Sequence, residues 1–488
     1  MINRFLLMLL LSSPHLIYAN EFIVSNAQNK QSVPDISQGI NNILIVWEDY
    51  RNSNADIWAQ LVDFSGNLVG SNFPIYNNPN DQRSPVVQWG ETSYLVVWEQ
   101  GIGGGNFHIY GQLIDSNGNL TGSEIPISTV NNKSQQPAIS FGNNKWFVVW
   151  ADSRNNNDLN IYGQMIDLNG VLIDSAIPIA VTTKEQLAPA LAWSETKKKF
   201  LVIWEDKRSD TSDIWGQIVD TSGIVVNSNF PICQATKNQL YPDIASNGTE
   251  WLTVWSDYRN GSSYNSIYAQ FLDTSNSIKG TNFLFAETLG YSLYSPKVVW
   301  NGNRWVIVYV ENNKIIHDNI SISNSSQDAF FPELTTIGNN CLAVWQDNRN
   351  NSWDDYDIYA NLFTPAGIEE KWSETTSRYG GINLTVSPNP FHNKTIIQYS
   401  GIVNRKNISD NEYTDQQIAI YNIGGKLVKS FPLIAFESER NPITWDGKDN
   451  LGQPVPPGIY FCKFNLNSIK KLNITKKIIR MAFDKAYK

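Results

Sequence analysis

Short runs of β-branched and aromatic residues, bounded by Asn, Asp, Gly or Ser, follow one another along most of the chain. The stretch Trp146 to Trp150 is typical, because it is apolar throughout and is followed, after Ala151, by the polar residues Asp-Ser-Arg. Runs of about four to eight such residues without helical periodicity indicate β-strands. The pattern therefore predicts many short strands and almost no helix.

The strand pattern is repeated, and tryptophan marks the repeat. Tyr309 falls where a long gap requires one more aromatic residue, and the intervals are then 51, 52, 54, 51, 54 and 36 residues. The tryptophans are Trp47, Trp98, Trp150, Trp204, Trp255 and Trp345. Each unit holds four predicted strands, which is typical of β-propeller blades. We predict an all-β chain whose residues 20–370 form a seven-bladed propeller of four-stranded blades, the sixth blade being degenerate.

The two ends of the repeat region are expected to complete one blade. After residues 364–367 the last unit lacks its fourth strand, whereas residues 22–25 precede the first unit and read as a strand. Within the units, turns such as residues 167–170 (Asp-Leu-Asn-Gly) have the Asp and Gly of a hairpin turn. The sequence thus predicts a ring closed by its first strand.

A second, smaller domain is expected after a polar linker at residues 371–382. Residues 383–488 contain six further strand-like runs, at 384–386, 395–399, 417–422, 443–445, 458–464 and 472–479, which suggest a small β-sandwich. At the other end, residues 1–19 have Arg4, an apolar stretch and Ala19, as in a secretory signal peptide. No segment is long and apolar enough to predict a transmembrane helix.

Each of the two domains has motifs that resemble those of a known family. The Trp-x-Asp-x-Arg units resemble the repeats of secreted bacterial β-propeller proteins. The last domain carries the motif residues Pro388, Asn389, Pro390, Phe391, Gly424, Trp445, Asp446, Gly447, Gly458 and Tyr460. With these residues it resembles the Ig-like C-terminal sorting domain of bacterial type IX secretion, and also the Ig-like domain of flagellar hook-capping proteins. The resemblance implies export by the type IX machinery and a location outside the cell or attached to its surface.

Charge separates the two domains. The net charge is -9, but residues 20–382 carry 21 Lys and Arg against 38 Asp and Glu, whereas residues 383–488 carry 15 against 8. An acidic main body repels phosphate backbones, so nucleic acid is not expected as a partner. The three cysteines, Cys233, Cys341 and Cys462, are scattered and read as buried hydrophobic residues. The histidines share no ligand spacing, and no catalytic residue or cofactor is predicted.

The most conspicuous polar motif is Asp-x-Arg, which follows the second strand in five of the seven units. Its arginines are Arg51, Arg154, Arg208, Arg259 and Arg349. Because loops between second and third strands meet at one end of a propeller, five guanidinium groups could bind carboxylate or sulfate groups there. In the alternative interpretation each Asp pairs with its own Arg, which makes the motif a repeated structural brace.

Two further ligand candidates lie in the same loops. Trp353 is a loop tryptophan that could stack on a sugar, whereas the strand tryptophans are expected to fill the space between blades. Asn and Asp are frequent there, and Ca²⁺ would accept their oxygens, although no run has the spacing of a known Ca²⁺ loop.

These features predict a secreted or surface-attached propeller that binds a glycan or a protein. Two alternatives stay open. An extracellular hydrolase or lyase acting on polysaccharide requires a unique cluster of carboxylates or tyrosines in the central channel, and a structural surface-layer component requires self-association. The sequence selects neither the ligand, nor the oligomeric state, nor whether the sorting domain is cleaved.

Overall fold

The computed structural model resolves two parts of the chain, each described by itself. In the first part it describes residues 21–365, without 131–132, 156–157, 260–263, 274–276, 289–290, 319, 326 and 351–354. In the second part it describes residues 383–387, 394–400, 417–422, 426–432, 443–456, 458–466 and 472–480. Contacts divide the chain into two compact units, Met1–Gly367 and Ile368–Lys488.

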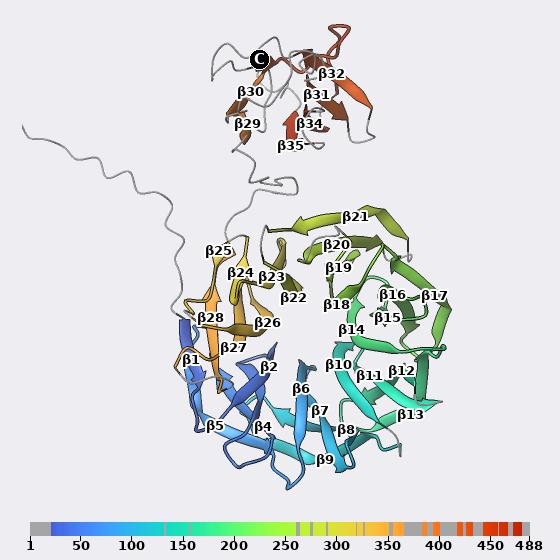
Figure 1. The fold of residues 1–488 in the computed structure, drawn as a ribbon, viewed down its shortest axis with the longest axis vertical. Helices are drawn as coiled ribbons and strands as arrows, with labels where there is room; N and C mark the ends of the chain where they lie inside the picture. The colour runs from blue at the N-terminus through green and yellow to red at the C-terminus, as the bar shows by residue number, and fades with distance from the viewer. Residues whose placement is uncertain are drawn as a thin grey trace, which may run out of the picture. The chain divides into compact units, whose positions relative to one another are not determined.

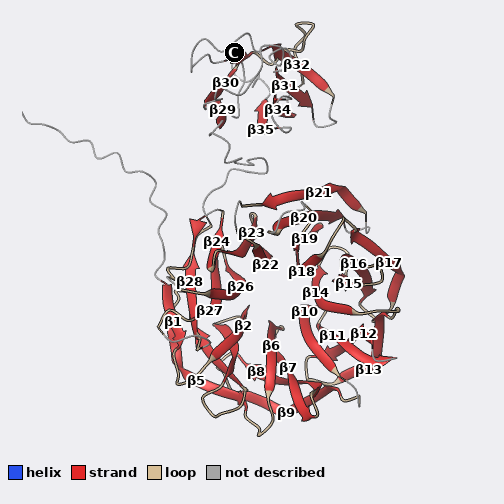
Figure 2. Ribbon diagram, viewed as in Figure 1, coloured by secondary structure: helices blue, strands red, loops and turns tan. Residues whose placement is uncertain are grey.

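The first unit is a seven-bladed β-propeller, as predicted (Figure 1). Its described elements are all strands (Figure 2). Blade one comprises β2 (Gln31–Gln38), β3 (Ile43–Asp49), β4 (Asp56–Val62) and β5 (Leu68–Tyr76). Blade two comprises β6 (Gln82–Trp89), β7 (Ser93–Gly103), β8 (Asn106–Asp115) and β9 (Leu120–Ser128). Blade three comprises β10 (Ser134–Gly142), β11 (Lys145–Asn155), β12 (Asp158–Asp167) and β13 (Leu172–Ala180).

The remaining blades repeat this order. Blade four comprises β14 (Gln186–Ser194), β15 (Lys199–Asp206), β16 (Asp213–Asp220) and β17 (Val225–Cys233). Blade five comprises β18 (Gln239–Ser246), β19 (Glu250–Asp257), β20 (Ser266–Asp273) and β21 (Ile278–Ala286). Blade six comprises β22 (Leu293–Trp300), β23 (Trp305–Glu311), β24 (Lys314–His317) and β25 (Ile320–Ser321), so its two outer strands are very short. Blade seven comprises β26 (Ala329–Ile337), β27 (Asn340–Asp347), β28 (Asp357–Phe363) and β1 (Glu21–Ser25).

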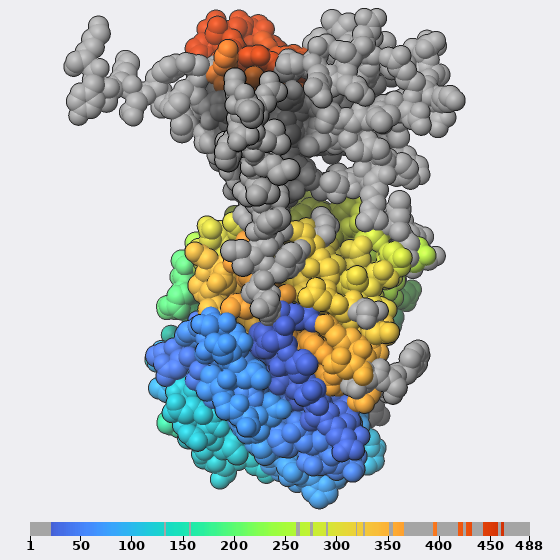
Figure 3. Space-filling view, turned by 90° about the vertical axis from the view of Figure 1, so that its left-hand side faces the viewer, coloured from blue at the N-terminus to red at the C-terminus, as the bar shows by residue number. Residues whose placement is uncertain are grey.

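The first strand closes the ring, which confirms the expectation for residues 22–25. β1 is antiparallel to β28, with Phe22 opposite Ala360 and Ile23 opposite Tyr359. In the space-filling view the blue N-terminal residues lie against the orange residues of the last repeat (Figure 3). Val24 is buried between blades seven and one, so the strand contributes to the core as well as to the sheet.

The repeated tryptophans fill the space between blades. All six are 0% exposed, and Tyr309, which replaces one of them, is 1% exposed. Trp98, for example, packs against Leu44 and Val46 of the preceding blade. The interpretation of these residues as core is therefore confirmed. The three cysteines are buried and unpaired, in agreement with their interpretation as small hydrophobic residues.

The inner strands share a bulge that also joins neighbouring blades. The residue before the inner proline has a positive φ in every blade: Val33, Ser84, Gln136, Ala188, Tyr241, Ser295 and Phe331. We call these seven positions the inner rim. The backbone amide of Tyr241 donates to Glu205 Oε1 of the preceding blade at 2.7 Å. At the equivalent place the amide of Val33 donates to Gln346 Oε1 at 3.0 Å.

This contact leads to a prediction for Glu205. Desolvation raises the pKa of its carboxyl group, against the hydrogen bond from Tyr241. A raised native pKa means that the group's contribution to stability is complete at acid pH and is lost as pH rises through that pKa. Glu205→Gln keeps an acceptor oxygen, as Gln346 provides in blade seven. As the pH is raised from 4 to 8, the free energy of unfolding of this variant should rise relative to that of the wild type. Glu205→Ala should lose about 1–3 kcal/mol because the Tyr241 amide loses its partner. Urea unfolding at the two pH values measures the free energy of unfolding of both variants. A Gln variant that becomes less stable than the wild type as the pH rises would refute the raised pKa of Glu205.

The second unit contains two small sheets. One has the order β29 (Asn383–Ser387), β30 (Thr395–Ser400), β33 (Ile443–Trp445). The other has the order β32 (Leu427–Pro432), β31 (Gln417–Asn422), β34 (Gly458–Leu466), β35 (Leu472–Arg480). All six predicted strands are present, and β32 is an additional strand that the sequence analysis missed. Among the residues that the model describes, no helix has the length and hydropathy of a membrane span.

Candidate functional site

The Asp-x-Arg motif forms the same closed unit in five blades. In blade three the Arg154 guanidinium donates from Nε to Asp152 Oδ1 at 2.9 Å and from Nη2 to Asp152 Oδ2 at 2.7 Å. The carboxylate also accepts from the Arg154 backbone amide, from Trp150 Nε1 and from the hydroxyl groups of Ser134 and Ser128. The Asp152 side chain is 0% exposed, whereas 23% of the Arg154 side chain is exposed. Blades one, four, five and seven have the same bidentate pair.

Each guanidinium group also lies on an aromatic ring. The Arg154 Cζ atom is 3.9 Å from the centroid of Tyr162, the residue that stands directly opposite Trp150 in the sheet. The equivalent rings belong to Trp58, Trp215, Tyr268 and Tyr359, at 3.6 to 4.0 Å. Cation–π stacking and the fork to Asp together fix the guanidinium plane. This geometry fits the structural brace. The fork uses the Nε hydrogen and one of the two Nη2 hydrogens, so Nη1 and the second Nη2 hydrogen remain for other partners; in blade five Arg259 Nη2 also donates to Asn282 Oδ1 at 3.3 Å.

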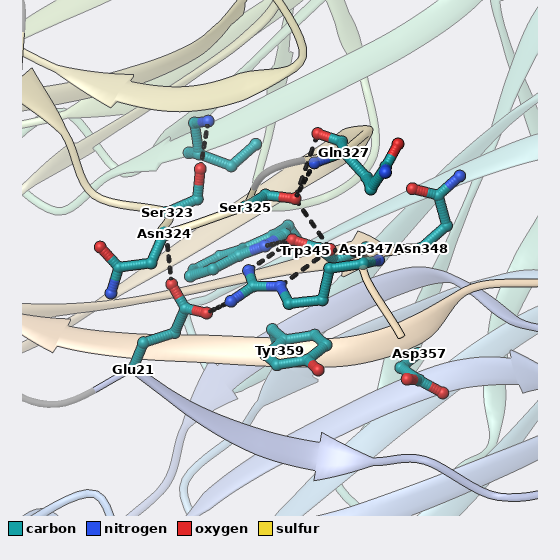
Figure 4. Close-up of polar contacts among 12 residues, drawn as sticks. Glu21, Ser323, Asn324, Ser325, Gln327, Trp345, Asp347, Asn348, Asp357 and Tyr359 are labelled. Carbon is teal, nitrogen blue, oxygen red and sulfur yellow. Dashed lines mark hydrogen bonds and ion pairs between the residues drawn. The ribbon is translucent and has the colours of Figure 1, made fainter. Parts of the chain in front are cut away.

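In blade seven the Nη1 atom of Arg349 binds the first strand (Figure 4). Arg349 Nη1 pairs with Glu21 Oε1, and Glu21 Oε2 accepts the backbone amide of Asn324 at 2.6 Å. Ser325 Oγ donates to Asp347 Oδ1 at 2.9 Å on the other side of the same cluster. The motif that braces the other blades thus becomes part of the ring closure.

The remaining loop predictions are resolved in part. Trp353 lies outside the described residues. In the first Asn-rich loop, Asn52 and Asn54 donate to the two oxygens of Asp56, which is turn chemistry. Among the described residues, no group of three or more His, Cys, Asp or Glu side chains is arranged to hold a metal ion. The Ca²⁺ suggestion therefore stays a prediction from the sequence alone.

A second polar cluster, which the sequence analysis missed, lies on the inner strands. It consists of Asp35, Asp243, Lys297 and Glu333, and we call it the axial quartet. Each follows the inner proline of its blade, in β2, β18, β22 and β26, and Figure 1 places these strands nearest the centre of the ring. Lys297 Nζ is 2.6 Å from Glu333 Oε1, and 31% and 24% of the two side chains are exposed. The quartet is therefore reachable from solvent.

Only four adjacent blades contribute charge to this position. Blades two, three and four carry Val86, Ala138 and Ala190 there, so one side of the inner wall is charged and the other is apolar. The aspartates also join neighbouring blades: Asp35 Oδ2 accepts the amide of Val87 at 2.6 Å, and Asp243 Oδ2 accepts that of Val298 at 2.7 Å.

The quartet is electrostatically coupled. Desolvation raises the pKa of Glu333 to about 8, although Lys297 opposes the shift. Desolvation likewise raises the pKa of Asp35 to about 6 and raises that of Asp243. For Lys297, burial alone would lower the pKa, but Glu333, Asp243 and Asp35 reverse this and raise it. The ammonium therefore stays charged, and burial favours the protonated form of the carboxyl groups around it.

Several of the motif residues named for the last domain build the centre of the second unit. Trp445 is fully buried, donates from Nε1 to the Lys448 carbonyl oxygen at 2.9 Å, and packs edge-on against Tyr460 at 5.2 Å. Asp446 Oδ1 accepts the Lys448 amide, and Gly447 has a φ of 71°. The remaining described motif residue, Gly458, begins β34. Residues 388–391 and Gly424 lie outside the described residues.

Comparison with known proteins gives a family match in the second unit. The family model of the FlgD Ig-like domain matches residues 408–468. No curated protein matches the chain. Similar solved structures include an α-L-arabinofuranosidase from Fusarium graminearum, with 11% identity and a TM-score of 0.42 over 72% of this chain and 98% of that one. They also include a neuraminidase-like protein of A/flat-faced bat/Peru, with 8% identity and a TM-score of 0.42 over 71% and 94%. A third is an endo-arabinanase from Bacillus licheniformis, with 13% identity and a TM-score of 0.33 over 53% and 100%. Likeness at this level says nothing about activity.

Proposed function

We propose that the chain is an extracellular binding protein whose propeller recognises a glycan or protein ligand at the end of the ring that carries the inner rim. The observation that carries the proposal is the axial quartet. Repeated groups such as Asp-x-Arg form hydrogen bonds within their own blade, whereas a ligand site is normally built from groups that occur once. The quartet breaks the sevenfold repeat, and its Lys297 and Glu333 side chains are partly exposed to solvent.

The test is binding of the purified full chain to an array of bacterial, plant and animal polysaccharides and to intact bacterial surfaces. Lys297→Met should weaken binding by about tenfold or more, because a charged hydrogen bond contributes roughly 1.5–3 kcal/mol. Arg154→Ala and Arg208→Ala, with thermal unfolding as a check on folding, test the predicted guanidinium contacts in parallel. Loss of binding only in folded arginine variants would move the site to the Asp-x-Arg loops. No binding to any surface would overturn the proposal.

The C-terminal unit is proposed to deliver the propeller to the outside through the type IX secretion machinery. The motif residues named above support this, as does the opposite charge of the two parts of the chain. Because Trp445 and Tyr460 are buried together, their part in export is to keep the unit folded, and exposed basic residues would make the contact with the machinery. Expression with and without residues 371–488 in a type IX-competent host, followed by fractionation, tests the assignment. Equal export of both forms would refute it.

A polysaccharide hydrolase is the second candidate. It is favoured by the axial quartet, which places several carboxyl groups in one cluster, and by burial, which raises the pKa of Asp35 to about 6 and that of Glu333 to about 8, since general acid–base catalysis uses carboxyl groups of different acidity. Release of reducing ends from any polysaccharide that the chain binds, abolished by Glu333→Gln with binding retained, would favour this candidate over binding alone.

A further inference from the structure

The inner rim carries two large exposed aromatic side chains next to the axial quartet. Tyr241 and Phe331 are 53% and 50% exposed, which is unusual for aromatic residues inside strands. Each stands two positions before a quartet residue, Asp243 in the first case and Glu333 in the second. They belong to β18 and β26, which flank β22 and its Lys297. The two rings therefore border the charged side of the inner wall.

The backbone conformation of the bulge does not explain why these two residues are aromatic. Their φ values are 55° and 50°, in the left-handed region that bulky residues seldom adopt. The bulge itself requires no aromatic residue, because Ser84, Ala188 and Ser295 occupy the same position in other blades. Packing within the blades therefore does not explain the presence of exposed aromatic side chains at these two strained positions.

The position of this rim within the blade follows from the strand register. Gln239, at the start of β18, stands opposite Asp257, and Ala329, at the start of β26, stands opposite Asp347. The two rings therefore lie near the end of the blades that carries the Asp-x-Arg units. A ligand that approaches this end meets the aromatic rim first and the quartet behind it.

The charge of this end selects the kind of ligand. The arginines there are neutralised by their own aspartates, and the quartet holds three carboxyl groups against one ammonium. Residues 20–382 as a whole carry 21 basic against 38 acidic residues. A uronate or sulfate group would be repelled, whereas hydroxyl groups can donate to carboxylates and accept from Lys297.

We infer that the inner rim of blades five to seven is a binding site for an uncharged saccharide, with Tyr241 and Phe331 as stacking surfaces and Asp243 and Lys297 as hydrogen-bonding groups. The inference rests on the proposed function and specifies its ligand. Aromatic rings offer apolar faces to the C–H surfaces of a sugar ring, and the charged groups behind them fix its orientation.

The experiment is calorimetric titration of the full chain with neutral xylo-, arabino-, manno- and gluco-oligosaccharides and, separately, with oligogalacturonate. Tyr241→Ala and Phe331→Ala should each weaken binding of the neutral ligand about three- to tenfold. Tyr241→Phe keeps the ring and should bind within about twofold of the wild type. Phe64→Ala is the matched control, because Phe64 is 38% exposed in the β4–β5 turn at the opposite end of its blade.

Each remaining outcome is informative. Neutral oligosaccharide binding that persists unchanged in the two alanine variants overturns this site but leaves the proposed function standing. Binding of oligogalacturonate in preference to every neutral ligand overturns the assignment of charge. Absence of oligosaccharide binding, with binding to cells or polysaccharides retained, also overturns the inference alone. Only the absence of every kind of binding removes the proposed function as well.

Discussion

Asp152→Ala is expected to lower the free energy of unfolding by about 3–5 kcal/mol, the usual consequence of breaking a buried ion pair from one side. The variant leaves Trp150 Nε1 without its acceptor and the Arg154 guanidinium without its fork. Ser134 Oγ, which donates to Asp152 Oδ2 at 3.2 Å, loses that acceptor and keeps its contact with Ser128 Oγ. Guanidinium chloride unfolding followed by tryptophan fluorescence measures the change.

The pH dependence of the same pair gives a check on its cause. Burial alone would raise the pKa of Asp152, but hydrogen bonds from Arg154 and Trp150 outweigh it and lower the pKa. A lowered native pKa means that the contribution is present above the unfolded value, about 3.9, and is lost as pH falls through the native value. The deficit of the variant should therefore shrink in acid. Asp210→Ala, at the exposed Lys184–Asp210 pair, is the control and should cause no measurable change. A deficit for Asp152→Ala below about 1 kcal/mol would contradict the brace.

Removal of residues 21–25 is expected to cost about 3 kcal/mol or more and to make the propeller self-associate. Burial of one large apolar side chain contributes about 1.5–3 kcal/mol, and β1 buries Val24 and part of Phe22. Its loss also uncovers the backbone of β28, and an open strand edge pairs readily with another chain. Light scattering after gel filtration and urea unfolding together measure the two effects.

A peptide of residues 21–25 supplied separately should restore the closed ring, and the same peptide with Val24→Asp should not. The milder variant Glu21→Gln isolates the pair with Arg349 from the strand itself. A truncated chain that stays monomeric and as stable as the intact one would show that blade seven does not need its fourth strand.

The fold could be predicted because the same weak signals recur in most of the seven units. One Trp-x-Asp-x-Arg segment says little, but its recurrence fixed the blade length, and the missing fourth strand of the last unit pointed to residues 22–25. β32 was missed because Lys429 and Ser430 interrupt its alternation and Pro432 ends it. The blade boundaries were therefore easier to predict than the strands of the unrepeated second unit.

The candidate site was harder, for a physical reason. Asp35, Asp243, Lys297 and Glu333 are far apart in sequence and meet only because the ring brings four inner strands together. Comparing the residue after each inner proline, where Val86, Ala138 and Ala190 stand in the other blades, would have revealed them. For Asp-x-Arg, the pairing at two-residue spacing could be anticipated, but the stacking of Arg154 on Tyr162 depends on the register opposite Trp150.

The closure of the ring by its first strand has a consequence for the order of folding. Glu21 and Arg349 are 328 residues apart in the sequence. At a synthesis rate of about 5–20 residues per second, β1 waits roughly 15–65 s for its partner strand to be made. During that interval the first strand stays unpaired, and a folding factor that shields it would act on the oldest segment of the nascent propeller.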